Sequence, residues 1–427
     1  MKRWAGQVSA AASVAMLCMS AGPVWADDPT TSGDRAELEV LKARIEKLEH
    51  KIADQDTKET LSAPPPQTAG IALPSGLQGV QMSGFADASF TYNLNNPQNR
   101  TNALRVFDTR ANSFMLNNAE LVIEKPVSSE SRTGFRTDLD FGTDSEVVGT
   151  VTSGLGSGSD ELDIQQAYAE YLAPIGNGVD IKAGKFVTLH GAEVIESKDN
   201  WNISRSYLFG YAIPFTHTGI RVNYPWSDTF STVVGVNNGW DIVDDNNQAK
   251  TVEMGFSATP IEHVSLGTTF MTGAEQTNNN GKQRQLLDIV AGYQPIEPLQ
   301  LKLNYDYGWE DDAAATVAFT NNNAVWQGLA AYAHYALTDR AALSLRGEFF
   351  NDMDGVRTGV ATGLNSVTSA GIKVYECTLT GEYKIFKNLV GRLEYRHDRA
   401  NEKVFRNRDL SQRSYQDTVA VEFIAPF

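Results

Sequence analysis

The sequence predicts an all-β fold, a transmembrane antiparallel β-barrel of about 16 strands preceded by a short N-terminal coiled-coil helix. Three observations lead to this prediction. From about residue 78 onward, apolar residues recur with a period of two, as in strands that have two different faces. The connections between these strands alternate between short and long. The chain also ends on a strand pattern, TVAVEFIAPF, whose apolar face runs to a final phenylalanine.

Residues 1–26 are expected to be a secretory signal that is removed after Ala26. Two basic residues at the start precede an apolar run at about residues 8–19, and small residues follow it. The alternative, a transmembrane anchor, would need a stretch of nearly 20 apolar residues. Removal of the signal would leave Cys377 as the one cysteine, so no intrachain disulfide is expected.

The formal charge of the chain is −16, and loss of the two basic signal residues would change it to −18. A negative net charge argues against nucleic-acid partners and against attachment of a polybasic segment to anionic lipid. No segment after the signal is apolar for long enough to form a transmembrane helix. If the mature chain spans a membrane, a closed barrel is the one option left, since every backbone polar group in lipid needs an internal partner.

Residues 27–60 are expected to form a periplasmic helix with a coiled-coil seam. Its apolar residues recur at alternating steps of three and four, which is typical of heptads: Leu38, Leu41, Ile45, Leu48 and Ile52. The alternative is a solvated helix with chance spacing. Two to three heptads are marginal alone, so the helix would assist an oligomer rather than create one. The Pro-rich residues 61–77 are expected to be a stiff linker, and residues 78–427 the barrel.

Strict alternation of side chains is clearest in three stretches: RTGFRTDLDFG (132–142), PLQLKLNYDYGWE (298–310) and NLVGRLEYRHD (388–398). In each one, the apolar and aromatic residues share one face, and the charged residues share the other. The polar faces are expected to line the barrel lumen, with many opposite charges paired across neighbouring strands. The predicted wall residues are Arg132, Arg136, Asp138, Asp140, Arg346, Glu348, Arg392, Glu394 and Arg396.

The connections favour a membrane barrel over a soluble β-sandwich, whose strands also alternate. Short connections are expected at 125–131, 173–178, 224–228, 259–263, 294–298, 337–340 and 384–388. Long polar connections rich in Asn, Gly and Asp lie between them. All short turns and both chain ends therefore fall on one side, which is the topology of outer-membrane barrels.

One long connection, residues 190–215, carries many large apolar residues, which a water-exposed loop should not do. We expect it to fold into the lumen and constrict the pore. The alternative is a cap that packs on other outer loops or against a neighbouring subunit. Its charged residues, the candidates for the constriction, are Glu193, Glu196, Lys198, Asp199 and Arg205.

Several long phrases resemble the outer-membrane β-barrel porins of the OmpL-like family. They include GFADASFTYNLNNP (84–97), QAYAEYLAPIGNGVDIKAGKFVT (166–188) and ESKDNWNISRSYLFGYAIPFTHTGIR (196–221). The resemblance covers most of residues 80–427, and it implies a diffusion channel in the outer membrane of a Gram-negative bacterium. The terminal phenylalanine resembles the signal favoured by the outer-membrane insertion machinery. The resemblance implies no individual functional residues for this sequence.

The expected function is therefore passive diffusion of small hydrophilic solutes and ions by a homotrimer in outer-membrane lipid, with a weak preference for cations. Two alternatives stay open: a phosphate- or anion-selective porin, and a non-conducting structural or adhesin barrel. The six histidines form no HxxxH or similarly spaced set. No enzymatic activity, catalytic residue, metal site or cofactor is expected.

Overall fold

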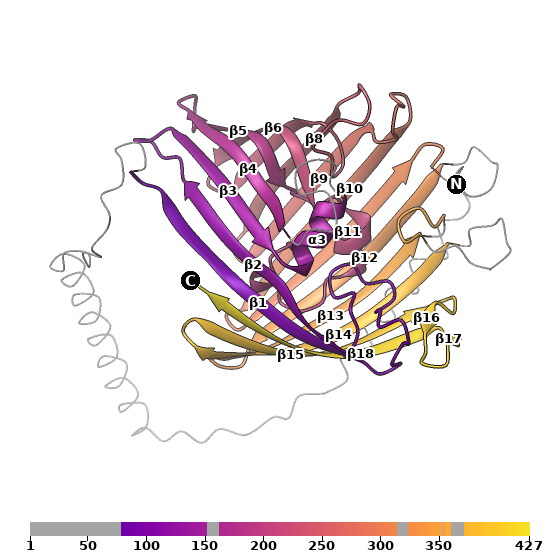
Figure 1. The fold of residues 1–427 in the computed structure, drawn as a ribbon. Coiled ribbons are helices and arrows are strands. Elements are labelled where there is room, and N and C mark those ends of the chain that lie inside the picture. The colour runs from indigo at the N-terminus through magenta and orange to yellow at the C-terminus, as the bar shows by residue number, and fades with distance from the viewer. Residues whose placement is uncertain (1–77, 152–161, 314–322, 353, 360–370) are drawn as a thin grey trace, which may run out of the picture. The chain divides into compact units, whose positions relative to one another are not determined.

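The computed structural model describes residues 78–151, 162–313, 323–352, 354–359 and 371–427. Within these residues, sixteen strands close into one antiparallel barrel (Figure 1). Each strand pairs with its neighbours in the sequence, and the first strand pairs with the last. The predicted fold, a closed barrel of about 16 antiparallel strands, is confirmed.

The strands of the barrel are joined in sequence order. They are β1 (Gln81–Asn93), β2 (Ser113–Lys125), β3 (Thr133–Phe141), β4 (Leu162–Ala173), β5 (Val179–Val187), β6 (Thr216–Ser227), β7 (Phe230–Asn237), β8 (Thr251–Ile261), β9 (Val264–Ala274), β10 (Gln283–Ile296), β11 (Leu299–Glu310), β12 (Ala324–Ala336), β13 (Ala341–Asp352), β14 (Ile372–Phe386), β15 (Leu389–Ala400) and β18 (Tyr415–Pro426).

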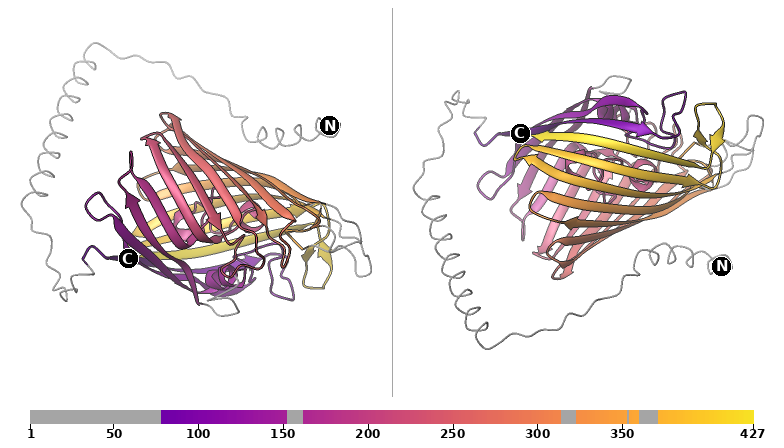
Figure 2. Two further views of the ribbon diagram at one scale, coloured as in Figure 1. Left: turned by 90° about the horizontal axis from the view of Figure 1, so that it is seen from above. Right: turned by 90° about the horizontal axis from the view of Figure 1, so that it is seen from below.

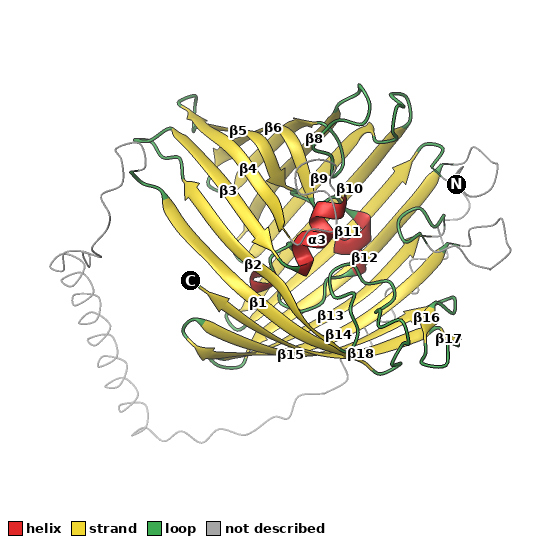
Figure 3. Ribbon diagram, in the orientation of Figure 1, coloured by secondary structure: helices red, strands yellow, loops and turns green. Residues whose placement is uncertain are grey.

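Short elements occupy some of the connections. A small hairpin, β16 (Phe405–Arg406) and β17 (Gln412–Arg413), lies between β15 and β18. An α-helix, α3 (Thr143–Val151), follows β3, and two single turns, η2 (Ser197–Asp199) and η3 (Leu208–Ala212), lie between β5 and β6. Figure 3 draws these helices in red in the middle of the view, with strands around them. None of the described helices is long and apolar enough to cross a membrane.

The two ends of the described chain close the barrel. β1 pairs with β18 from Phe85 opposite Pro426 to Asn93 opposite Thr418. The ladder extends to the last residue, because the Phe427 N–H donates to the Gly84 carbonyl at 2.9 Å and the Gly84 N–H donates to the Phe427 carbonyl at 3.1 Å. The final strand is thus paired with β1 from Thr418 to the last residue, and no sheet edge is left open there.

Short and long connections alternate around the barrel (Figure 2). Residues 228–229, 262–263, 297–298 and 387–388 form short turns between strand pairs. Because consecutive strands run in opposite directions, all short turns lie at one end of the barrel, the end that also holds the start of β1 and the end of β18. The longest fully described connection, residues 188–215, begins and ends at the other end.

Side chains sort between the two faces of each strand with the strand period of two. In β15, Leu393 and Tyr395 are 59% and 46% exposed, whereas Arg392, Glu394 and Arg396 are buried. The outer face is therefore apolar, as lipid requires, and the charged face points inward. The last strand, β18, sorts its side chains in the same way, with Val421 and Phe423 on the exposed face.

The predicted signal (1–26), coiled-coil helix (27–60) and linker (61–77) lie outside the described residues. The same holds for the five seam residues, Leu38 to Ile52. These assignments, and the domain boundaries drawn from them, stay predictions.

Candidate functional site

The inner face of the barrel meets the connection between β5 and β6, residues 188–215, which we call the β5–β6 segment. Its two ends are joined by a hydrogen bond from the Thr188 N–H to the Phe215 carbonyl at 2.9 Å. Asp241, in the next long connection, accepts from the N–H groups of Phe215 and Thr216 at 2.6 and 3.0 Å. Both ends of the segment are thus fixed to the barrel rim.

Buried arginines of the wall bind the β5–β6 segment. Arg346 of β13 donates to Glu193 at 2.7 Å and to the Ser204 carbonyl at 2.6 Å, while its Nε donates to Glu376 of β14 at 2.7 Å. Arg396 of β15 donates to the Arg205 carbonyl at 2.6 Å. The planar guanidinium groups satisfy wall carboxylates and segment carbonyls at the same time.

Two wall carboxylates accept pairs of consecutive N–H groups from the same segment. Glu348 accepts from the N–H groups of Tyr207 and Leu208 at 2.7 and 2.6 Å. Glu394 accepts from those of Ile203 and Ser204 at 2.6 and 3.0 Å. Carboxyl oxygens thus satisfy buried backbone donors that have no strand partner, which fixes the irregular backbone in place.

Contacts of aromatic and apolar side chains complete the attachment of the β5–β6 segment. The indole N–H of Trp326 on β12 donates to the Ala212 carbonyl at 3.0 Å, and Leu208 is fully buried. The Phe209 and Phe215 rings lie 5.4 Å apart and both contact Phe107 of the connection between β1 and β2. These contacts explain why the β5–β6 segment carries so many large apolar residues: they form one core with buried residues of the barrel strands, such as Leu286 and Phe350.

The five predicted constriction residues do not converge on one point. Glu193 pairs with Arg346, as described above. Glu196 accepts from Gln165 of β4 at 2.5 Å. Lys198 and Asp199 pair with each other, and both are partly exposed. Arg205 lies 3.4 Å from Asp144 of α3.

Arg205 and Asp144 illustrate how strongly this region is buried. Burial raises the pKa of Asp144 to about 7, although the guanidinium of Arg205 acts in the opposite direction. Arg205 also donates to the carbonyls of Ile203 and Ile195 and lies over the Phe107 ring, 5.0 Å from its centroid. Its charge is therefore engaged within the protein.

The nine predicted wall residues divide into two groups. Those on β13 and β15 hold the β5–β6 segment: Arg346, Glu348, Glu394 and Arg396 as above, and Arg392 through the Ser197 carbonyl at 2.9 Å. Those near β3 serve the wall: Arg136 pairs with Asp138 at 2.9 Å, Arg132 donates to the Leu172 carbonyl at 3.2 Å, and Asp140 is buried. A pore-lining role stays a prediction for all nine.

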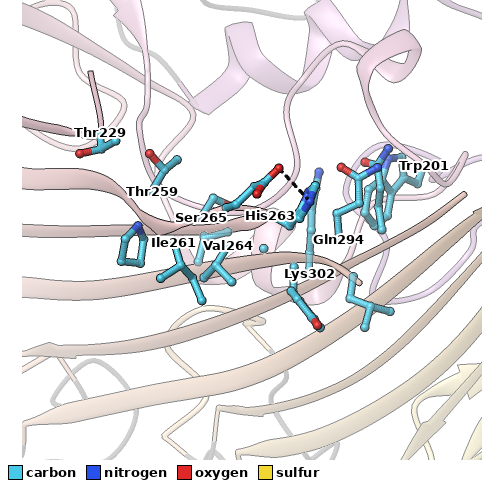
Figure 4. A pocket seen from close by; sticks show the side chains of 16 residues that line it. Trp201, Thr229, Thr259, Ile261, His263, Val264, Ser265, Gln294 and Lys302 are labelled. Carbon is cyan, nitrogen blue, oxygen red and sulfur yellow. Dashed lines mark ion pairs between the residues drawn. The ribbon is translucent and has the colours of Figure 1, made fainter. Parts of the chain in front are cut away.

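Two cavities lie against strands β5 to β11. The larger, about 640 Å³, is lined by Trp201 of the β5–β6 segment and by residues near the short turns, among them Lys302 and His263 (Figure 4). The Lys302 ammonium lies 4.2 Å from the centroid of the Trp201 ring, and His334 is stacked against the same ring. The smaller cavity, about 400 Å³, is lined by Lys182 and Arg221, among others.

Three inward side chains, Asp87, Asn118 and Glu120, are absent from the predicted wall set. They lie on β1 and β2, where a β-bulge at Asp87/Ala88 shifts the register. The bulge breaks the alternation of SFMLNNAELVIEK, so the pattern does not show which face Asn118 and Glu120 occupy. Among the described residues, no group of three or more His, Cys, Asp or Glu side chains could hold a metal ion.

Comparisons with known proteins agree with this geometry. The family model described as "Putative beta-barrel porin-2, OmpL-like" matches residues 79–427. No match was found among curated proteins.

Solved structures share the fold at low sequence identity. The anion-selective porin from Comamonas acidovorans aligns with a TM-score of 0.55 at 10% identity, over 82% of this chain and 99% of its own. The outer membrane channel DcaP of Acinetobacter baumannii gives 0.53 at 13% identity, over 82% and 97%. A loop L8 deletion mutant of OmpT, an outer membrane protein of Vibrio cholerae, gives 0.53 at 11% identity, over 82% and 99%.

Proposed function

The chain belongs to the OmpL-like beta-barrel porin family, and from this premise we propose that it forms a water-filled channel for passive diffusion of small hydrophilic solutes and ions across a bacterial outer membrane. The observation that carries the proposal is the family match over the whole barrel. A polar inner face and an exposed apolar outer face support it. Family and fold point to a channel rather than to an enzyme.

The β5–β6 segment is the element that narrows this channel. The proposal is supported by its hydrogen bonds to Arg346, Glu348, Arg392 and Glu394, which lie on the buried faces of β13 and β15. A segment bonded to inward side chains reduces the cross-section that solutes can use. The alternative is that the segment forms a cap that packs on other outer loops or against a neighbouring subunit.

A weak cation preference is the second part of the proposal. An anion-selective pore needs basic side chains that are free to meet the anion. Arg346, Arg392 and Arg396 instead each pair with one or more carboxylates. One alternative is a phosphate- or anion-selective porin, and another is a non-conducting structural or adhesin barrel.

The proposal also includes a homotrimer and an N-terminal helix in the periplasm.

Solute uptake into liposomes tests the proposed function. The full-length protein is reconstituted into liposomes, and swelling is followed in isosmotic solutions of uncharged sugars of increasing size. We expect a monosaccharide to enter quickly and an oligosaccharide to enter slowly, because the constriction sorts solutes by size. Liposomes without protein give the baseline. Swelling no faster than this baseline, with a barrel that is demonstrably folded, would favour the structural or adhesin reading.

A further inference from the structure

The larger cavity lies at the short-turn end of the barrel (Figure 4), where the turns at 228–229 and 262–263 contribute to its rim. Lys302 of β11 faces the lumen, because it lies two residues from the buried Asn304 on the same face of the strand. Val290 lines both the larger and the smaller cavity. The two spaces therefore follow one another along the wall, and a solute moving along it passes Lys302.

The strand register builds the wall of the larger cavity. It places Ser265, Gly292, Lys302 and Tyr332 in one row across β9, β10, β11 and β12. The Ser265 hydroxyl leans over Gly292, where an added Cβ would meet it. Because Gly292 has no side chain, the space between Ser265 and Lys302 stays open for a solute.

An indole of the β5–β6 segment holds the Lys302 side chain. The ammonium lies 4.2 Å from the centroid of the Trp201 ring, a cation–π distance. The same ring is stacked on His334, with centroids 5.2 Å apart, and meets Tyr332 edge-on at 6.5 Å. Lys302 is thus placed at the boundary between the wall and the segment.

The Lys302 ammonium forms no ion pair or hydrogen bond with the described residues. Glu193 is the carboxylate whose charge acts on it. Its two oxygens accept instead from Arg346 and from a backbone N–H of the segment, both at 2.7 Å. Glu262, at the rim of the cavity, lies 3.3 Å from His263. The positive charge of Lys302 is therefore available to an anion in the lumen.

Neutral polar side chains line the same cavity: Thr259, Ser265 and Gln300. None of the three side chains forms a hydrogen bond with another described residue. Hydroxyl and amide groups both donate and accept, which suits the hydroxyl groups of a solute. An ammonium forms strong, charge-assisted hydrogen bonds with a carboxylate. A cavity of about 640 Å³ also has the size of a small-molecule site.

We propose that the larger cavity is a binding site for small solutes that carry both a carboxylate and hydroxyl groups, such as sugar acids, with Lys302 bound to the carboxylate. The inference rests on the proposed channel function and deepens it by naming a class of solute. An anion-selective pore needs a continuous basic track. One ammonium makes a local site, so the weak preference for small cations is a separate property.

Binding is tested on the folded full-length protein in detergent, with gluconate as the probe. Because Trp201 contacts Lys302, the tryptophan fluorescence should change saturably as sodium gluconate replaces sodium chloride at constant ionic strength. Glucose, which lacks the carboxylate, and acetate, which lacks the hydroxyls, should give no such change. A response to either that equals the response to gluconate overturns the proposed class of solute.

Two variants and a control locate the site. Lys302→Gln should weaken gluconate binding about ten-fold or more, as expected for loss of a charge-assisted hydrogen bond. Gly292→Val keeps the charge but fills the open space, and it should also weaken binding. The control, Lys387→Gln, removes the same charge from an exposed position in the turn 387–388 and should bind like the wild type. Wild-type binding by Lys302→Gln overturns the proposal. If Lys302→Gln does not fold, wild-type binding by Gly292→Val overturns it.

Planar-bilayer recording separates the site from the proposed function. In KCl, added gluconate should reduce the single-channel current of the wild type and of Lys387→Gln more than that of Lys302→Gln. Equal reduction in all three proteins overturns the proposal. If fluorescence shows saturable binding but the folded protein does not conduct, the proposed function fails and the site stands. If the protein conducts without a saturable response to gluconate, the site fails alone.

Discussion

Arg346 and Glu193, 153 residues apart in the sequence, form an ion pair of 2.7 Å inside the barrel, with side chains that are 0% and 5% exposed. One partner belongs to β13 and the other to the β5–β6 segment. The pair therefore joins the wall directly to the element that we propose narrows the channel. Because both groups are buried, loss of either one leaves the other without a full set of partners.

Glu193→Gln should destabilise the barrel by about 2 kcal/mol, since it leaves Arg346 with Glu376 as its one remaining carboxylate at hydrogen-bond distance. The unfolding midpoint in denaturant measures this. The control is Glu146→Gln, which alters a half-exposed pair with Arg110 at 3.4 Å, and such pairs contribute roughly 0–1 kcal/mol. Equal shifts in the two variants would mean that the buried pair does not anchor the segment.

Gly308→Ala should destabilise the barrel by about 1–3 kcal/mol, because a Cβ at this position would overlap the buried indole of Trp326 on the adjacent strand. The ring would have to move and would lose its hydrogen bond to Ala212 of the β5–β6 segment. Gly347→Ala is the matched control, since a Cβ there meets nothing within 4 Å. Thermal unfolding of both variants measures the difference in stability. Equal unfolding temperatures of the two variants would show that the Trp326 ring moves without a cost in free energy.

Acidification should weaken the barrel through His190 at the start of the β5–β6 segment. Burial, with a further contribution from nearby His217, lowers the pKa of His190 to about 3 from an ordinary value of 6.5. A lowered pKa of a base means that stability is fully present above pH 6.5 and is lost as the pH falls toward 3. At pH 4.5 the loss is about 2–3 kcal/mol.

His190→Gln removes this titration, so its unfolding temperature should fall less between pH 7 and pH 4.5 than that of the wild type. His263→Gln, on an exposed short turn, should follow the wild type. Parallel curves for the wild type and His190→Gln would show that His190 does not titrate in this way.

Replacing Ile45 and Leu48 with Asp should weaken the proposed oligomer without unfolding the barrel, because both residues belong to the predicted heptad seam. Chemical cross-linking of the purified protein measures the oligomer. A barrel that stays folded but yields fewer cross-linked species is the expected result. Identical oligomers in variant and wild type would mean that the seam plays no part in assembly.

The barrel could be predicted from the sequence because its strands encode their own faces. In NLVGRLEYRHD, each residue on one parity is apolar or aromatic from Leu389 to Tyr395, and the other parity holds Arg392, Glu394 and Arg396. Lipid outside and charge inside make this period visible along a single strand. Connection lengths then supply the topology, and closure follows from the need to leave no open edge.

The candidate site could be predicted only in part, because its contacts join distant parts of the chain. The composition of residues 190–215 indicates a segment that is packed rather than solvated. The composition does not show that Glu193 pairs with Arg346 of the wall. It also does not show that Arg205 pairs with Asp144 of α3. Alternation also fails where a bulge inserts a residue: Asn117 and Asn118 of β2 are consecutive and both buried, so the pattern of this strand does not show which face Glu120 occupies.

Single-channel recording in a planar bilayer tests the central claim most directly, with the full-length protein and a variant that lacks residues 194–209. If the barrel is a diffusion channel narrowed by the β5–β6 segment, the wild type will give discrete conductance steps, and the deletion variant will give larger ones. The absence of steps from a folded wild type would contradict the channel. Steps of the same size in both proteins would contradict the constriction.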